Sequence, residues 1–185
     1  MTEVLTATAS SGRLRRFSRA MAAVTTVGTV LIAIAMVLVF FIPDWTRTFL
    51  IARVGQPGAG LPLTPGRLIA GAAVTAVPIG VMLYGLWQAR ALFRDFAEGR
   101  VFTRDSARRL HLFAGAVLAQ AVLGPASSTG LLLAFTLSNP PGQRLLGITL
   151  SVNDYVALIV GGVLLAISWV MVEAARIADE HARFV

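Results

Sequence analysis

Four stretches of the sequence are strongly apolar and nearly free of charged side chains, and each is long enough to cross a lipid bilayer. A hydrocarbon core about 30 Å thick requires roughly 20 mostly apolar helical residues. We therefore expect spans over residues 20–42, 68–89, 107–127 and 155–172. Charged side chains make up 14% of the chain, whereas soluble domains carry roughly 25%. These features predict an integral membrane protein with four transmembrane helices in a single domain, residues 1–185.

The uncharged region that begins at Leu110 continues to Pro141, which is too long for one helix to explain. We expect the third helix to end near Ser127. Beyond it, residues 139–142 read Asn-Pro-Pro-Gly, a strong turn signal. Residues 148–153 alternate apolar and polar types with the period of two that is typical of a strand. The predicted fold class is therefore all-α integral membrane, with four transmembrane helices and a short extracytoplasmic β-hairpin.

The connection between the second and third spans is expected to form a helical hairpin over residues 89–109. Gly99 is suited to end the second helix, because glycine adopts the conformation that stops a helix. Thr103 can cap the start of the third helix, and Asp105 falls in its first turn, where a negative charge is favourable. The fourth span is expected to begin at a cap supplied by Asn153 or Asp154.

Arginines are distributed unevenly over the connections between spans. All 16 basic residues are arginines. Four precede the first span, six lie between the second and third, and two follow the fourth, whereas the other two connections hold three and one. The positive-inside rule then places both termini and the central connection in the cytoplasm of a bacterial inner membrane, with a C-terminal cytoplasmic helix over 173–185. Because the arginines flank apolar spans, direct nucleic-acid binding is not expected.

Several chemistries are excluded by composition. The chain has no cysteine and no lysine, which excludes disulfides, thiol nucleophiles, Schiff-base lysines and the Walker A lysine. No paired-carboxylate site or nucleophile with its base is recognisable. His111 and His181 would supply too few ligands for a metal, and a pH-sensitive pair is the other interpretation of them. We expect neither enzymatic activity, nor a cofactor, nor a metal.

Two polar residues near or within the spans have structural and functional interpretations. Gln120 is the only strongly polar residue deep in a span. It is expected to hydrogen-bond a neighbouring helix, but together with kinks at Pro78 and Pro125 it also fits a small-solute transporter or channel component. Glu173, at the end of the fourth span, is expected to pair with Arg176 or with Arg108 or Arg109 of the third helix.

Two segments, 92–114 and 162–185, resemble a family catalogued as domain of unknown function 2975. The first contains the pattern F-x-x-G-x-x-F-T over Phe96–Thr103, followed by Arg108 and Arg109. The second ends in E-A-x-x-I-A-D-E-x-A-x-F-V over Glu173–Val185, and residues 138–154 also resemble the family. The resemblance implies a four-helix bacterial membrane protein and no established activity. It also implies a partner, because members are sometimes encoded beside small helix-turn-helix regulators.

The residues shared with these patterns gather on the face expected to be cytoplasmic. The expected interaction face consists of Phe96, Gly99, Phe102, Arg108, Arg109, Glu173, Arg176 and Glu180. We therefore expect a non-enzymatic sensory or regulatory component acting through this face, with a small-solute transporter or channel component as the alternative. The expected partners are the lipid bilayer, a cytoplasmic protein such as a helix-turn-helix regulator, and further copies of the chain.

Overall fold

In the computed structural model, every secondary-structure element of the described residues is a helix. The structure describes residues 2–56, 60–101, 103–137, 139 and 146–181, without the side chains of 2–11, 178, 179 and 181. The helices in these residues are α1 (Thr2–Phe41), α2 (Pro43–Val54), α3 (Pro65–Ala97), α4 (Arg104–Thr136) and α5 (Val152–His181).

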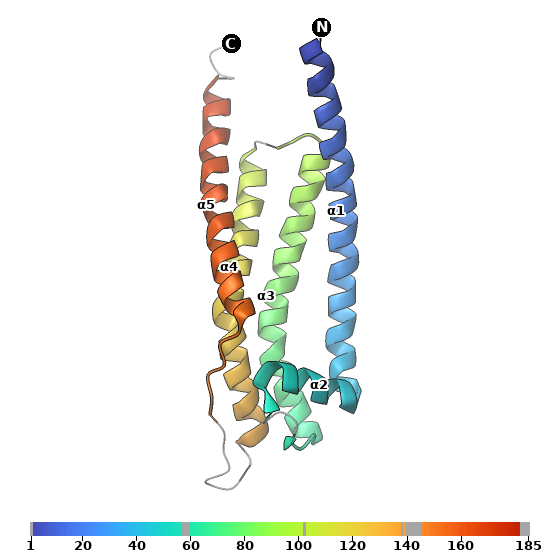
Figure 1. Cartoon of the computed structure of the whole chain (residues 1–185), viewed down its shortest axis with the longest axis vertical. Coiled ribbons are helices and arrows are strands. Elements are labelled where there is room, and N and C mark those ends of the chain that lie inside the picture. Colours follow the sequence, from blue (N-terminus) through green and yellow to red (C-terminus); the bar gives the residue numbers. More distant parts are fainter. Residues whose placement is uncertain (1, 57–59, 102, 138, 140–145, 182–185) are drawn as a thin grey trace.

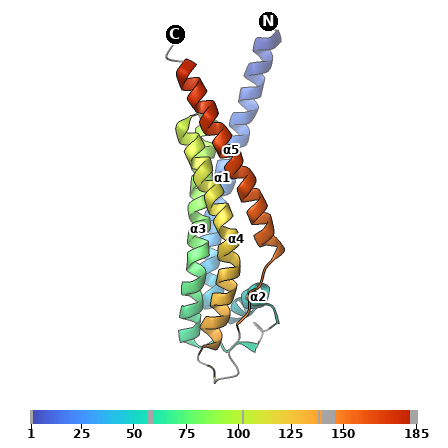
Figure 2. The same cartoon turned by 90° about the vertical axis from the view of Figure 1, so that its left-hand side faces the viewer.

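The four long helices lie side by side in the order α1, α3, α4, α5 (Figure 1). α4 contacts both α3 and α5 extensively, and α1 contacts α3. α5 crosses α4 obliquely (Figure 2). The start of α1, the α3–α4 connection and the end of α5 lie together, and we call this the arginine-rich end. We call the opposite end, where α2 lies across the long helices, the α2 end.

All four long helices are apolar enough to cross a membrane. The candidate spans are Gly12–Phe41, Pro65–Ala97, Arg104–Thr136 and Val152–Ile177. In the most apolar part of α1 only 6% of the residues are buried within the chain, against 33% in α4. Exposed apolar helices of this length are stable in lipid, where helices satisfy their own backbone hydrogen bonds. The four expected helices are thus confirmed, and they indicate a multi-pass membrane protein with α4 at its centre.

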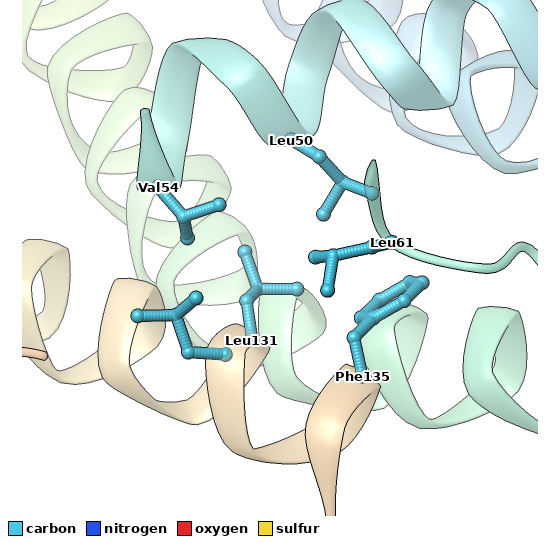
Figure 3. Packing of buried hydrophobic residues seen from close by; sticks show 6 residues of the cluster. Leu50, Val54, Leu61, Leu131 and Phe135 are labelled. Atoms are coloured by element: carbon cyan, nitrogen blue, oxygen red, sulfur yellow. The ribbon is translucent and has the colours of Figure 1, made fainter. Parts of the chain in front are cut away.

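The main hydrophobic core lies at the α2 end (Figure 3). It is built by α2, by the segment that follows α2, and by the last turns of α4. Its buried members are Leu50, Val54, Leu61, Leu131, Leu132 and Phe135. α2 therefore packs across the end of α4. The sequence had not predicted this helix within residues 43–67.

The corner between α1 and α2 is set by a proline and a threonine. Ile42 is extended, as expected before Pro43, and Pro43 occupies the first turn of α2. The buried hydroxyl of Thr46 donates to the carbonyl oxygens of Val39 at 2.6 Å and Ile42 at 3.1 Å. The bond to Val39 reaches a carbonyl oxygen in the last turn of α1, and the Ile42 carbonyl oxygen also accepts the Thr46 backbone N–H at 3.0 Å, so Thr46 connects the start of α2 to the end of α1.

The predicted β-hairpin is wrong. Residues 131–136, expected as its first strand, continue α4 as a helix, and 146–151 form no strand; of the expected turn at 139–142, only Asn139 lies within the described residues. The helix continues because Leu131, Leu132 and Phe135 share the face that packs under α2. The hydroxyls of Ser127 and Ser128 donate to the carbonyl oxygen of Gly124, so these residues cause no break in the helix.

The period-two pattern after residue 146 nevertheless has a structural basis. Leu146, Ile148 and Leu150, at every second position of this non-helical segment, are 77–78% exposed. Gly147, between Leu146 and Ile148, meets α4, where its carbonyl oxygen accepts a hydrogen bond from Thr129 at 3.0 Å. The alternation therefore reports an extended backbone with two different faces, but not a strand paired with another.

The expected helix ends are right at the α3–α4 connection and wrong at α5. Gly99 has φ +84°, and Thr103 caps α4 by accepting a hydrogen bond from the Ser106 N–H. At α5 the cap is Ser151 rather than Asn153 or Asp154. The Ser151 hydroxyl and the Asp154 carboxylate each accept a hydrogen bond from the other's backbone N–H, at 3.2 and 2.8 Å. This is a reciprocal capping box.

Gly161 permits the close contact of α5 with α4, and this yields the first prediction. A Cβ at Gly161 would lie 2.8 Å from the backbone nitrogen of Leu118, whereas at Gly162 it would meet nothing within 4 Å. Gly161→Ala should therefore lower the free energy of unfolding by about 1–3 kcal/mol, the usual cost of overpacking. Unfolding in detergent would measure it, with Gly162→Ala as the matched control. Equal stability of the two variants would contradict the close α4–α5 contact.

Candidate functional site at the arginine-rich end

A buried carboxylate organises the α3–α4 connection. Asp95, near the end of α3, is only 5% exposed. Its Oδ1 lies 2.8 Å from Arg100 Nη2, and its Oδ2 lies 3.0 Å from Arg109 Nε. A buried carboxylate is costly unless it is paired. Asp95 therefore holds together the end of α3, the connection and the first turns of α4.

Hydrogen bonds within the connection reinforce this arrangement. The Arg100 N–H donates to the Asp95 carbonyl oxygen at 2.9 Å, and the buried Ser106 hydroxyl donates to the Arg100 carbonyl oxygen at 2.9 Å. Arg100 also pairs with the exposed Glu98 at 2.7 Å. The hydrogen bond to Asp95 and the charge of Glu98 raise the pKa of Arg100. The connection is thus a fixed turn held by side chains from both helices.

α1 lies against the same connection. A Cβ at Gly99 would come within 3.3 Å of the guanidinium of Arg15. One turn along α1, Ser18 is 1% exposed. The connection is therefore supported by three of the four long helices.

A cavity of about 600 Å³ opens beside the connection, between α4 and α5, and we call it the basic groove. Its apolar walls are Leu112 and Val172, and its basic residues are Arg104, Arg108, His111 and Arg176. His111 Nδ1 lies 3.1 Å from the Ser168 hydroxyl. Because that hydroxyl donates to the Leu165 carbonyl oxygen, Nδ1 is the donor to Ser168, and the ring is held against α5.

A second, smaller depression lies on the α3 side of α4. Its lining includes Tyr84, Gln88 and Asp105 together with Arg108, which also lines the basic groove. Arg90 lies over the ring of Trp87, 5.8 Å from its centroid, beside Arg94 and Arg109 in a neighbouring hollow. The arginine-rich end therefore presents basic side chains on both sides of α4.

Residues 51–183 match a family model described as Protein of unknown function (DUF2975). The chain belongs to this family. The match covers both walls of the basic groove and the whole α3–α4 connection. No curated protein and no solved structure matches the chain.

The residues expected to form the interaction face of this DUF2975 protein are distributed between the groove and its surroundings. Arg108 and Arg176 line the groove. Glu173 pairs with Arg176, at 3.1 Å from Nε, and Glu180 approaches the same guanidinium at 3.3 Å. Glu173 therefore does not bridge to α4, and Arg109 pairs with Asp95 instead.

The remaining expected residues lie closer to the connection or outside the described part of the chain. Phe96 is half-buried and Gly99 is exposed. Phe102 and the side chain of His181 lie outside the described residues, so the expected pairing of His181 with His111 falls there too. Among the described side chains, no group of three or more His, Cys, Asp or Glu could hold a metal.

Asp95 was missed by reasoning from the sequence. Asp95 is not among the residues that the sequence pattern singles out, because a charged residue of an amphipathic helix is expected to face solvent. The signal that could have indicated its burial was its position three residues after Leu92, on the same helical face. Arg100 and Arg109, its partners in the structure, follow soon after it in the sequence.

Gln120 behaves as its structural interpretation requires. Its side-chain amide donates to the Pro78 carbonyl oxygen of α3 at 2.8 Å. The amide therefore connects α4 to α3 at the proline within α3.

The second prediction concerns the carboxylate of Asp95. Asp95→Asn should destabilise the connection by about 1–3 kcal/mol, because a buried pair is broken but both arginines remain partly exposed. Trypsin cleavage after Arg100 should accelerate accordingly. Glu98→Gln is the control, since it removes an exposed pair with the same arginine, worth about 0–1 kcal/mol. Equal cleavage rates in the two variants would show that Asp95 does not hold the turn.

Proposed function

We propose that the chain is a non-enzymatic regulatory component of a bacterial inner membrane, and that its basic groove binds an acidic segment of a cytoplasmic protein. The observation that carries the proposal is the groove itself, in which Arg104, Arg108 and Arg176 surround the apolar walls Leu112 and Val172.

The orientation follows from charge. In the sequence, twelve of the 16 arginines fall outside the spans on the same side by connectivity: four before the first span, six between the second and third, and two after the fourth. Such an excess of arginine is typical of the cytoplasmic side of a membrane protein. In this orientation both termini and the basic groove face the cytoplasm.

The chemistry of the groove favours an occupant with both acidic and apolar side chains. Arg108 makes no hydrogen bond or ion pair with any residue in the described part of the chain, and it is exposed. A carboxylate placed beside it would gain a charge-assisted hydrogen bond. An adjacent apolar side chain would bury the exposed walls, so an amphipathic acidic helix fits both features.

The support beneath the groove is consistent with a recognition surface. Asp95 fixes the first turns of α4, and His111 and Ser168 join α4 to α5 at the groove. A surface that is ordered before binding loses less conformational entropy when its partner binds.

The alternative of a transporter or channel component has less support. It relied on Gln120 as an intramembrane polar group, and the side-chain amide of Gln120 is engaged with Pro78. Most charged side chains of the described spans lie near the arginine-rich end or the α2 end, and Asp154, which lies against Gly124 of α4, accepts hydrogen bonds from Ser151.

The third prediction tests the partner directly. A photo-crosslinking residue in place of Leu112 should capture one cytoplasmic protein with an acidic amphipathic segment, and a probe in place of Leu14, exposed on α1, should not. Arg108→Glu should lower the capture by about tenfold or more, because a charge-assisted contact becomes a repulsion. Arg13→Glu, at the same end but outside the groove, is the matched control.

A compensating charge reversal in the captured partner tests whether Arg108 contacts an acidic residue directly. An acidic residue of the partner changed to arginine should restore capture by the Arg108→Glu variant. Capture of phospholipid alone, or capture that is indifferent to Arg108→Glu, would overturn the proposal.

A further inference from the structure

A second cavity, of about 430 Å³, lies at the α2 end between α2, α4 and the start of α5, and we call it the α2 cleft. It is separate from the basic groove, and the two share no lining residue. Its floor is formed by Met82 of α3 and by Gln120 and Gly124 of α4. It therefore extends from the α2 end toward the middle of the spans.

The extended segment before α5 forms a polar wall of this cleft. Thr149 and Ser151 line the cleft, whereas Ile148 and Leu150, which alternate with them, do not line it and are 78% and 77% exposed. Irregular backbone at membrane depth is stable where it is covered by protein or lines a polar cavity. The alternation of polar and apolar side chains in this segment therefore suits a wall between a polar cavity and the apolar lipid.

The cleft holds one charged side chain of each sign. Arg53, in the last turn of α2, lines it and makes no hydrogen bond or ion pair with any described residue. Asp154 lines it from α5. One oxygen of Asp154, Oδ2, accepts hydrogen bonds from the Ser151 N–H and hydroxyl, at 2.8 and 2.7 Å. The other, Oδ1, has no hydrogen-bond donor among the described residues.

Gly124 makes room for this second oxygen. A Cβ at Gly124 would collide with Oδ1 of Asp154. The carboxylate thus lies directly against α4, at a glycine that lines the cleft together with Asp154.

From these features we propose that the α2 cleft binds a zwitterion, a molecule with a primary ammonium group and an oxyanion. The ammonium would contact Asp154 Oδ1, and the oxyanion would contact the guanidinium of Arg53. A ligand with a single charge would pair with only one of the two side chains and would leave the other without a partner of opposite charge. The apolar residues Phe49, Met82 and Ala157 would contact the remainder of the ligand.

Two sources carry this chemistry, a free amino acid and the head group of phosphatidylethanolamine. The cavity volume falls in the range of about 300–1,000 Å³ that is usual for small-molecule sites. The proposal concerns a different end of the molecule from the cytoplasmic partner, so it holds or fails independently of the proposed function.

The absence of cysteine from the chain permits a direct test by thiol protection. Ala157→Cys places a single thiol in the cleft, and Gln56→Cys places one at an exposed position just after α2 as the control. L-leucine, added to the full chain in detergent, should slow alkylation at position 157 and leave position 56 unchanged. Neither 4-methylpentanoate nor 4-methylpentylamine, which each lack one of the two charges, should protect.

Lipid is tested in nanodiscs of phosphatidylglycerol, with and without phosphatidylethanolamine. Protection by L-leucine identifies a free solute, and protection by phosphatidylethanolamine alone identifies a lipid head group; either result supports the zwitterion site. Protection by neither, or equal protection by the singly charged analogues, overturns it.

Two substitutions assign the contacts. Asp154→Asn retains an acceptor for Ser151, and Arg53→Gln removes the opposite charge. Each should weaken binding of the protecting zwitterion by about tenfold or more, and Asp44→Asn, on α2 outside the cleft, should not. Unchanged protection in both variants would overturn the assignment, and the comparison of analogues on the parent chain still decides the proposal if a variant does not fold.

Discussion

The fold depends on the absence of water from the bilayer core, where each backbone polar group must find a partner within the protein. The four long helices meet this requirement locally, which is why α1 is stable with only 6% of the residues in its most apolar part buried within the chain. The same requirement limits where irregular backbone can lie. The extended segment 146–151 is positioned against α4, where Thr129 donates to the carbonyl oxygen of Gly147, and its exposed apolar side chains cover the other face.

This requirement explains which parts of the fold were predictable from sequence. Long apolar helices, the stop at Gly99 and the cap at Thr103 depend on residues close together in the chain, and these predictions are confirmed. The β-hairpin failed because period-two alternation reports an extended backbone with two environments, and a strand also needs a hydrogen-bonded neighbour. α2 was not foreseen because its stability depends on burial of Leu50 and Val54 under α4, a contact distant in sequence.

The candidate site shows the same division. Arg108 and Arg176 were predicted to belong to one interaction face, and the structure brings both of them, together with Arg104, to one groove. The pairing of Arg109 was not predictable. Arg109 was a candidate partner for Glu173, but in the structure it pairs with Asp95. Asp95 is only 5% exposed, and an unpaired charge costs more free energy at a buried carboxylate than at an exposed glutamate. Burial of Asp95 is a property of the packed helices, and the composition of the segment does not reveal it.

The two cavities have a structural relation through α4 and α5. Each cavity is lined by both helices: Leu112 and Val172 at the basic groove, and Gly124 and Asp154 at the α2 cleft. Between them the helices touch where Gly161 meets the backbone of Leu118, a contact too close to admit a methyl group. A ligand in the cleft could alter the groove only by binding one α4–α5 arrangement more tightly than another. Gly161 is a position where such a difference would be resisted, since a hypothetical Cβ there meets backbone atoms of Leu118 and no flexible side chain can absorb a shift.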